Sequence, residues 1–188
     1  DVFDIEIAEN DPDKLVEIIA ALEPTFGAIN LEDIKAPECF EVERRLRERM
    51  RIPVFHDDQH GTAIITAAGF VNALQLTGRK IETTKLVVNG AGAAGLSCSG
   101  LMKMMGVKAE NLLLCDSQGV LYQGRTKGVD QFKAAYLNDT PHRTLAEARA
   151  NASGLARDLA NDKDFADVAT LAMNASLASR WASRLLKS

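Results

Sequence analysis

Several features that would place this chain of 188 residues in a special class are scarce. No apolar run approaches the roughly 18 residues that span a bilayer, so we expect no membrane association. The net charge of −4 argues against a broad basic surface for nucleic acid. The chain begins without methionine, a basic n-region or a signal peptide, as would the middle of a longer protein, and we expect a cytoplasmic location.

Cysteine is scarce as well. The chain has three cysteines, an odd number at wide spacing, which favours neither a disulfide framework nor a zinc site and is typical of a reducing compartment. We expect each to be a small buried hydrophobic residue. Nucleophilic catalysis has no support, because Ser97 and Ser99 lack a G-x-S-x-G context.

The most informative feature that is present is a glycine pattern between an apolar run and a predicted helix. Gly90, Gly92 and Gly95 form G-x-G-x-x-G after the predicted strand 85–88, and residues 93–105 predict the helix. The first glycine permits a tight turn, the second allows a pyrophosphate to approach, and the third lets the helix pack near the strand. The N–H groups of Ala93 and Ala94 would then face the phosphates.

An acid completes this dinucleotide-binding signature. Asp116 follows a second apolar run, 112–115, and lies about 20 residues beyond Gly95, where an acid accepts hydrogen bonds from the ribose hydroxyls. An acid there repels a 2′-phosphate and favours NAD. NADP stays open, because Arg125 and Lys127 follow a little further on. The other interpretation is a tightly packed turn without a ligand.

Strands and helices are expected to alternate along the chain. We predict strands at 2–7, 28–31, 53–55, 85–88 and 112–115, and helices at 12–22, 38–50, 61–76 and 93–105. In the second helix, Glu41–Arg45 and Glu43–Arg47 are expected as ion pairs on a solvated face. The order predicts an α/β fold with mainly parallel sheets and a Rossmann-type unit. The Ala/Ser-rich residues after about 144 predict one or two helices, roughly 145–159 and 165–186.

Four carboxylates follow two neighbouring predicted strands. Glu32 and Asp33 end one, and Asp57 and Asp58 end the next. The carboxyl ends of parallel strands share one edge of a sheet, where ligands bind. Like charges gathered there raise one another's pKa, and a divalent cation relieves this; oxygen ligands favour Mg²⁺ or Mn²⁺. The alternative is that these residues are helix caps and surface charges.

Together these motifs closely resemble malic enzymes. The resemblance rests on the segments 3–6, 22–40, 51–64, 87–95 and 114–125 and covers roughly residues 1–148. It implies oxidative decarboxylation of L-malate to pyruvate and CO₂, with NAD or NADP as cofactor and Mg²⁺ or Mn²⁺. It also implies that Glu32, Asp33 and Asp58 bind the metal, that Asp57 orients the catalytic lysine, and that the protein is a homodimer.

The resemblance divides the chain into three parts: residues 1–60 as the end of a substrate and metal domain, 61–148 as a partial nucleotide-binding domain, and 149–188 as a tail. The family's general-acid tyrosine and general-base lysine match no position of this sequence. Because such groups contribute about 10²–10⁴-fold to rate, we expect the chain alone to be nearly inactive. A nucleotide-binding fragment without catalysis, or an association module, is the alternative.

Overall fold

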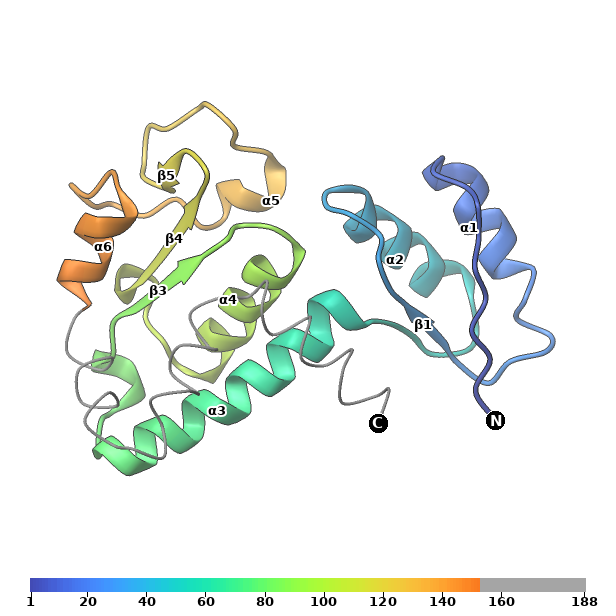
Figure 1. Cartoon of the computed structure of the whole chain (residues 1–188), viewed down its shortest axis with the longest axis horizontal. Coiled ribbons are helices and arrows are strands. Elements are labelled where there is room, and N and C mark those ends of the chain that lie inside the picture. The colour runs from blue at the N-terminus through green and yellow to red at the C-terminus, as the bar shows by residue number, and fades with distance from the viewer. Residues whose placement is uncertain (153–188) are drawn as a thin grey trace. The chain divides into compact units, whose positions relative to one another are not determined.

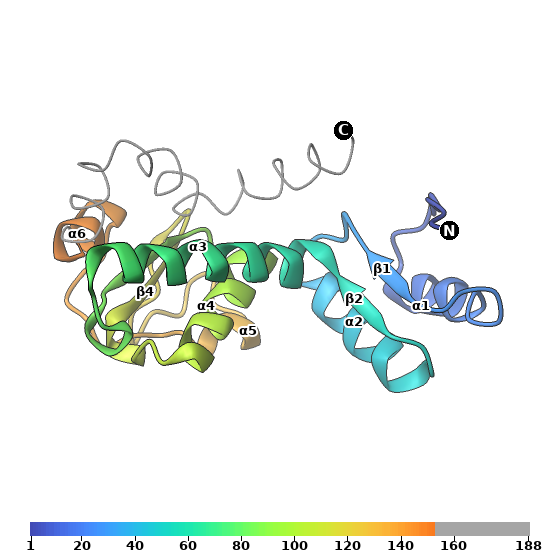
Figure 2. The same cartoon turned by 90° about the horizontal axis from the view of Figure 1, so that it is seen from below.

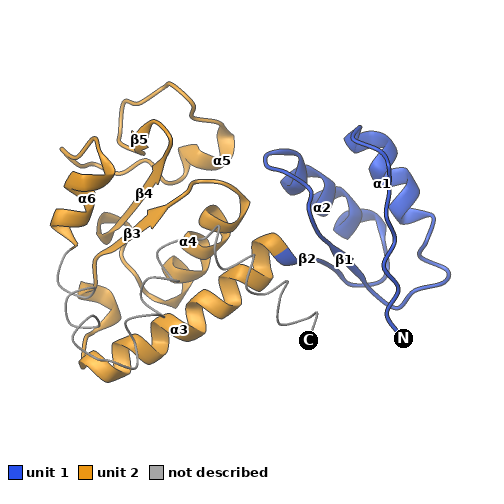
Figure 3. Cartoon of the chain, viewed as in Figure 1, with its two compact units in different colours: residues 1–57 blue, residues 58–188 orange. Residues whose placement is uncertain are grey.

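The computed structural model describes residues 1–152, and they confirm the α/β fold. The chain divides into two compact units, residues 1–57 and 58–188, which are described separately (Figure 3). The predicted helix 165–186 and the end of 145–159 lie outside the described residues. Within residues 1–152, no helix has the length and apolar character needed to cross a bilayer.

The first unit contains two helices and a pair of parallel strands. These are α1 (Pro12–Ala20), β1 (Ile29–Leu31), α2 (Glu38–Arg49) and β2 (Val54–His56). Strand β1 pairs with β2 from Ile29↔Val54 to Leu31↔His56, so both strands end at the same edge. One apolar cluster joins the four elements: Leu15, Val16, Ile19, Leu31, Val42, Leu46, Met50 and Val54. Burying this cluster holds the short strands in place.

Two expectations for this unit are wrong. Residues 2–7 form no strand, because β1 and β2 pair with each other and the alternating segment has no strand partner; Val2 is 95% exposed. Arg45 does not pair with Glu41. It reaches across to Asp13 of α1 at 2.6 Å, while Glu41 binds Arg44. The Glu43–Arg47 pair is present at 3.8 Å, although the Glu43 side chain is buried rather than solvated.

The second unit begins at Asp58, within a π-helical turn, Asp57–Gly61, and contains a three-stranded sheet with helices. Its larger elements are α3 (Thr62–Thr77), β3 (Leu86–Asn89), α4 (Ala93–Met105), β4 (Leu112–Asp116), β5 (Gly119–Val120), α5 (Gln131–Ala134) and α6 (Leu145–Asn151) (Figure 1). Short 3₁₀ turns at Ile81–Thr83 and Ala109–Asn111 precede β3 and β4. Strands β3 and β4 are parallel, and β5 is an antiparallel edge strand.

The layers of this unit follow from where apolar side chains fall. Strand β4 is buried along residues 112–115, as expected for a central strand covered on both faces. Helix α3 lies along α4 (Figure 2). Helix α6 contacts β3 and β5, and its Ala148 joins the apolar cluster of Leu113, Cys115 and Val120. All three cysteines are buried thiols, as expected. This packing holds β3 and β4 in place next to the glycine-rich turn that follows β3.

Candidate functional site

The glycine-rich turn connects β3 to α4 over three residues. Strand β3 ends at Asn89, the backbone N–H of Gly90 donates to the Cys115 carbonyl at 2.8 Å, and α4 begins at Ala93. Gly90 has a φ of 118°, a left-handed conformation that a side chain would strain. The turn is therefore hydrogen-bonded to β4 at the carboxyl ends of the parallel strands, where nucleotide-binding sheets bind their ligand.

Gly92 and Gly95 serve different purposes in this turn. A Cβ on Gly95 would lie 1.7 Å from the Gly90 carbonyl oxygen, so α4 approaches the turn too closely for any side chain. A Cβ on Gly92 would meet nothing within 4 Å, and the φ of this residue, −96°, is open to other amino acids. Packing therefore requires glycine at 95 but not at 92, where the backbone faces open space.

The first turn of α4 contains no acidic residue. The first hydrogen bond of the helix runs from the Leu96 N–H to the carbonyl of the N-cap residue, Gly92, at 3.0 Å. The N–H groups before it, on Ala93, Ala94 and Gly95, have no partner inside the helix, as at every helix start. Together with the helix dipole they provide a partial positive charge beside the open space at Gly92, an arrangement suited to a phosphate.

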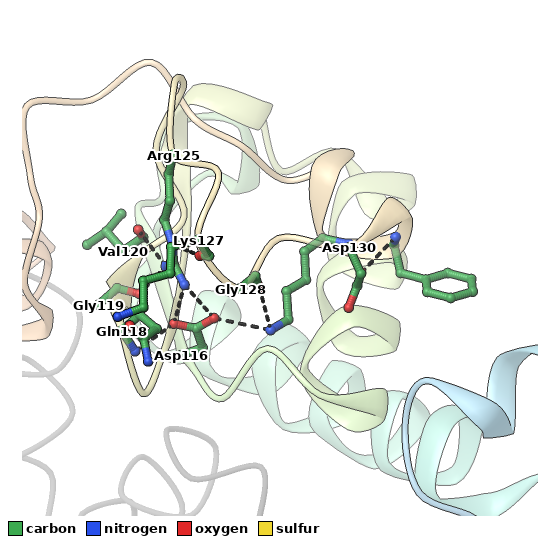
Figure 4. A network of polar contacts seen from close by, with 10 residues as sticks. Asp116, Gln118, Gly119, Val120, Arg125, Lys127, Gly128 and Asp130 are labelled. Atoms are coloured by element: carbon green, nitrogen blue, oxygen red, sulfur yellow. Dashed lines mark hydrogen bonds and ion pairs between the residues drawn. The ribbon is translucent and has the colours of Figure 1, made fainter.

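Asp116 ends β4 and is the centre of a polar network (Figure 4). Both carboxylate oxygens accept from Arg125 Nη2 at 2.8 Å, Oδ1 also accepts from the Gln118 N–H at 2.8 Å, and Oδ2 accepts from Lys133 Nζ at 3.2 Å. The Asp116 side chain is 11% exposed and that of Arg125 is 4% exposed. The carboxylate is thus held by two cations and a backbone donor.

All three guanidinium nitrogens of Arg125 donate hydrogen bonds. Its Nη1 donates to the carbonyls of Gly119 at 3.1 Å and Val120 at 3.0 Å, and its Nε donates to the Lys127 carbonyl at 3.0 Å. Burial works to raise the pKa of Asp116, but the hydrogen bonds from Arg125, Gln118 and Lys133 outweigh it and hold that pKa below its ordinary value. Asp116 is therefore ionised at neutral pH.

Sequence reasoning identified only part of this network. Of the two basic residues that the sequence places a little beyond Asp116, Arg125 makes the contact, whereas Lys127 contributes only its backbone carbonyl. Lys133 was missed. It lies on the four-residue helix α5, which is capped by the Asp130 side chain, a local signal that could have marked the helix.

The four carboxylates near the strand ends are placed in two units. In the first unit, Glu32 and Asp33 follow β1, and Asp57 follows β2. Asp58 is the first residue of the second unit. Asp33 has a φ of 58°, an uncommon backbone for a residue other than glycine and one often found at functional sites. Within residues 1–152, no three or more His, Cys, Asp or Glu side chains are gathered as a metal site.

Comparisons with known proteins match two segments of the chain to domains of one family. The family described as the malic enzyme NAD-binding domain matches residues 59–161, and the malic enzyme N-terminal domain matches residues 4–47. An NADP-dependent malic enzyme of Haemophilus influenzae is 60% identical over 152 residues, which are 80% of this chain and 20% of that protein. An NAD-dependent malic enzyme of Rhizobium meliloti is 57% identical over 148 residues, 79% of this chain and 19% of that protein.

A solved structure shows the same likeness. The crystal structure of an NAD-dependent malic enzyme from Thermotoga maritima is 42% identical, with a TM-score of 0.73, and the match covers 78% of this chain and 40% of that one. The chain spans about a fifth of the length of the curated relatives described above. The matched domain covers more than half of the chain. The chain therefore belongs to the malic enzyme family.

Proposed function

We propose that this chain provides the dinucleotide-binding turn of an NAD(P)-dependent malic enzyme, which oxidatively decarboxylates L-malate to pyruvate and CO₂. The observation that carries the proposal is the contrast between Gly95, where packing requires glycine, and Gly92, where it does not. Open space in front of the N-terminus of a helix is what a bound pyrophosphate needs. The family supplies the reaction, and the turn supplies the cofactor site.

The chain's own residues would bind and orient the cofactor. The N–H groups at the start of α4 would hold the pyrophosphate, so the nicotinamide extends from a fixed point towards the substrate. Asp116 would face the adenosine ribose from the end of β4. Because Arg125, Gln118 and Lys133 already donate to both of its oxygens, a ribose hydroxyl would share an oxygen or replace Lys133.

The network bears on the choice between NAD and NADP. Asp116 alone would repel a 2′-phosphate, but Arg125 and Lys133 neutralise its charge, and the Lys133 side chain is 19% exposed. We propose that this chain accepts both cofactors, as its NADP- and NAD-dependent relatives together suggest. The weak preference for NAD expected from an acid at position 116 loses its electrostatic basis.

The metal belongs to the proposal as well. Carboxylate oxygens are ligands that Mg²⁺ and Mn²⁺ prefer, and we propose Glu32, Asp33 and Asp58 as those ligands and Asp57 as the acid that orients a catalytic lysine. Support comes from their place after the strand ends and from the left-handed backbone of Asp33. A bound divalent cation would polarise the substrate oxygens. The homodimer and the cytoplasmic location stay predictions.

Calorimetry with NAD⁺ and NADP⁺ tests the cofactor site on the whole chain. We expect Gly92→Ala to weaken binding of both at least 10-fold while the melting temperature stays within 1–2 °C, about the effect of a tolerated substitution. Gly27→Ala is the matched control, because its Cβ also meets nothing within 4 Å but it lies in the first unit. Unchanged binding by the Gly92 variant would contradict the proposal.

Turnover of malate with Mn²⁺, followed at 340 nm, separates the enzyme from its alternative. The alternative is a chain that binds the cofactor without catalysis. Binding with no turnover would support that second function. Turnover at ordinary enzyme rates, about 1–10³ s⁻¹, would exclude it.

A further inference from the structure

We propose that Tyr136 is a positioning residue for the dinucleotide: its hydroxyl holds the first turn of α4 in place and so sets how tightly the pyrophosphate binds. This inference rests on the proposed function, and it adds a residue that no sequence motif marks. Tyr136 lies about 40 residues after the glycine-rich turn, just beyond α5.

The contact is made to the residue that follows the last glycine of the turn. The Tyr136 hydroxyl donates to the Leu96 carbonyl at 3.0 Å, and Leu96 directly follows Gly95. The ring is partly buried, and burial raises the pKa of the phenol, which therefore keeps its proton at neutral pH and remains a donor. The bond thus joins the loop after α5 to the part of α4 whose N–H groups face the open space.

Helix α4 leaves room for this contact. A Cβ on Gly100 would lie 3.1 Å from the Tyr136 hydroxyl oxygen, tighter than most contacts of real side chains, so glycine at 100 lets the hydroxyl reach the helix backbone. Further along α4, Lys103 Nζ lies 5.2 Å from the centre of the Tyr136 ring, within the range of a cation–π interaction. Both contacts tie the ring to one face of α4.

The same short segment also reaches the other half of the site. The Lys133 carbonyl accepts from the Tyr136 N–H at 2.9 Å, and Lys133 Nζ donates to Asp116 at 3.2 Å and to the Gly128 carbonyl at 3.1 Å. Residues 130–136 therefore contact α4 through Tyr136 and the end of β4 through Lys133. One segment thereby links the N-terminus of α4 to the acid proposed to face the ribose.

A pre-formed site binds more tightly, because less order must be gained on binding. Asp116 at the end of β4 would fix the ribose end of the cofactor. The N–H groups at the start of α4 can then reach the pyrophosphate only if α4 and β4 keep their spacing. Removing the Tyr136 hydroxyl leaves α4 packed against α3 and takes away one hydrogen bond that holds its first turn. We therefore expect the loss to appear in ligand affinity more than in stability.

The experiment is calorimetric titration of the whole chain and its Tyr136→Phe variant with ADP and with NAD⁺. We expect the dissociation constants to rise about 3- to 10-fold, the size of one neutral hydrogen bond. Tyr122→Phe is the matched control: Tyr122 is the one other tyrosine of the chain, and its ring stacks on Arg143, at 3.8 Å. The control should bind as the unmodified chain does.

Adenosine, which lacks the pyrophosphate, distinguishes positioning from mere stabilisation. If Tyr136 has a positioning role, the Tyr136→Phe variant binds ADP more weakly and adenosine with unchanged affinity. The ratio of the two dissociation constants then shifts about 3- to 10-fold. A structural role leaves that ratio as it was. Equal losses for both ligands, or a loss no larger than that of Tyr122→Phe, would overturn the inference. Failure of the unmodified chain to bind any of the ligands would instead count against the proposed function.

Gly100→Ala provides a second variant in case Tyr136→Phe does not fold. Alanine favours a helix interior over glycine, so the melting temperature should hold or rise, whereas the added Cβ pushes the Tyr136 hydroxyl away from Leu96. We expect ADP affinity to fall at least 2-fold in this variant while stability does not. Unchanged ADP affinity in the Gly100 variant would also overturn the inference.

Discussion

Loss of Arg125 should strongly destabilise the second unit. Its guanidinium is 4% exposed and donates to Asp116 and to the carbonyls of Gly119, Val120 and Lys127. Replacing it with Met keeps much of its volume and removes every donor. Asp116 would keep two of its partners, the Gln118 N–H and Lys133, in a site that is 11% exposed.

The expected loss of stability follows from the Asp116 carboxylate, which Arg125→Met leaves buried without its main partner. Removing one partner of a buried ion pair costs about 3–5 kcal/mol, because the remaining charge is left without its partner. Since Lys133 stays beside Asp116, we expect the lower end, about 3 kcal/mol for Arg125→Met. In a domain of this size that loss lowers the melting temperature by roughly 10 °C.

The effect should depend on pH in a definite direction. In the unmodified chain the pKa of Asp116 is lowered, so its contribution to stability is complete above its unfolded pKa of about 3.9 and is lost as the pH falls through the folded pKa. Without Arg125, the pKa of Asp116 rises from this lowered value, because a hydrogen bond that lowers it is lost while burial still opposes ionisation, so protonation relieves the variant first. The difference in stability should therefore be largest at pH 7 and shrink towards pH 4.

Urea unfolding followed by far-UV circular dichroism between pH 4 and 8 measures this difference. Arg125→Met with Asp116→Asn should recover part of the stability at pH 7, because no charge is stranded. Arg44→Met, which removes an exposed pair with Glu41 and Glu48, is the control and should leave the midpoint unchanged. A loss below about 1 kcal/mol, or one that does not change with pH, would refute the reasoning.

Four further outcomes can be checked directly. Gly95→Ala should cost about 1–3 kcal/mol, measured by urea unfolding, and abolish NAD⁺ binding, because its Cβ meets the turn backbone at 1.7 Å. Lys133→Gln should weaken NADP⁺ more than NAD⁺, by about 10-fold in calorimetry, since one cation beside the acid is lost. Asp11→Ala should lower stability by about 1 kcal/mol, because it caps α1. The cysteines should resist a thiol reagent at pH 8 until the chain unfolds, since burial raises the pKa of Cys115 to about 11.

Local signals predicted most of the elements. Helix α4 spans the predicted residues, and β1 and β4 start or end within a residue or two of their expected bounds. Each is specified nearby in the chain: a glycine before α4, buried apolar residues in β4, and turn residues around both. The strand expected at 2–7 failed because a strand also needs a partner, which alternation along one segment does not reveal.

The glycine-rich turn was also predictable, because its chemistry is written in consecutive residues, and the structure adds the reason that Gly95 and Gly92 differ. The partners of Asp116 were not predictable in the same way. Lys133 reaches it from a four-residue helix whose place depends on the hairpin of β4 and β5 and on Arg125.

The sequence by itself determined the family, the α/β order of elements and the position of a phosphate-binding turn, because these depend on short segments and local backbone preferences. Only the tertiary structure decided which charges neutralise Asp116, which arginines of α2 reach α1, and that Tyr136 touches α4. Those contacts join residues 9 to 40 positions apart in the chain. They depend on burial and on packed elements that bring a donor and an acceptor within about 3 Å, which no local pattern encodes.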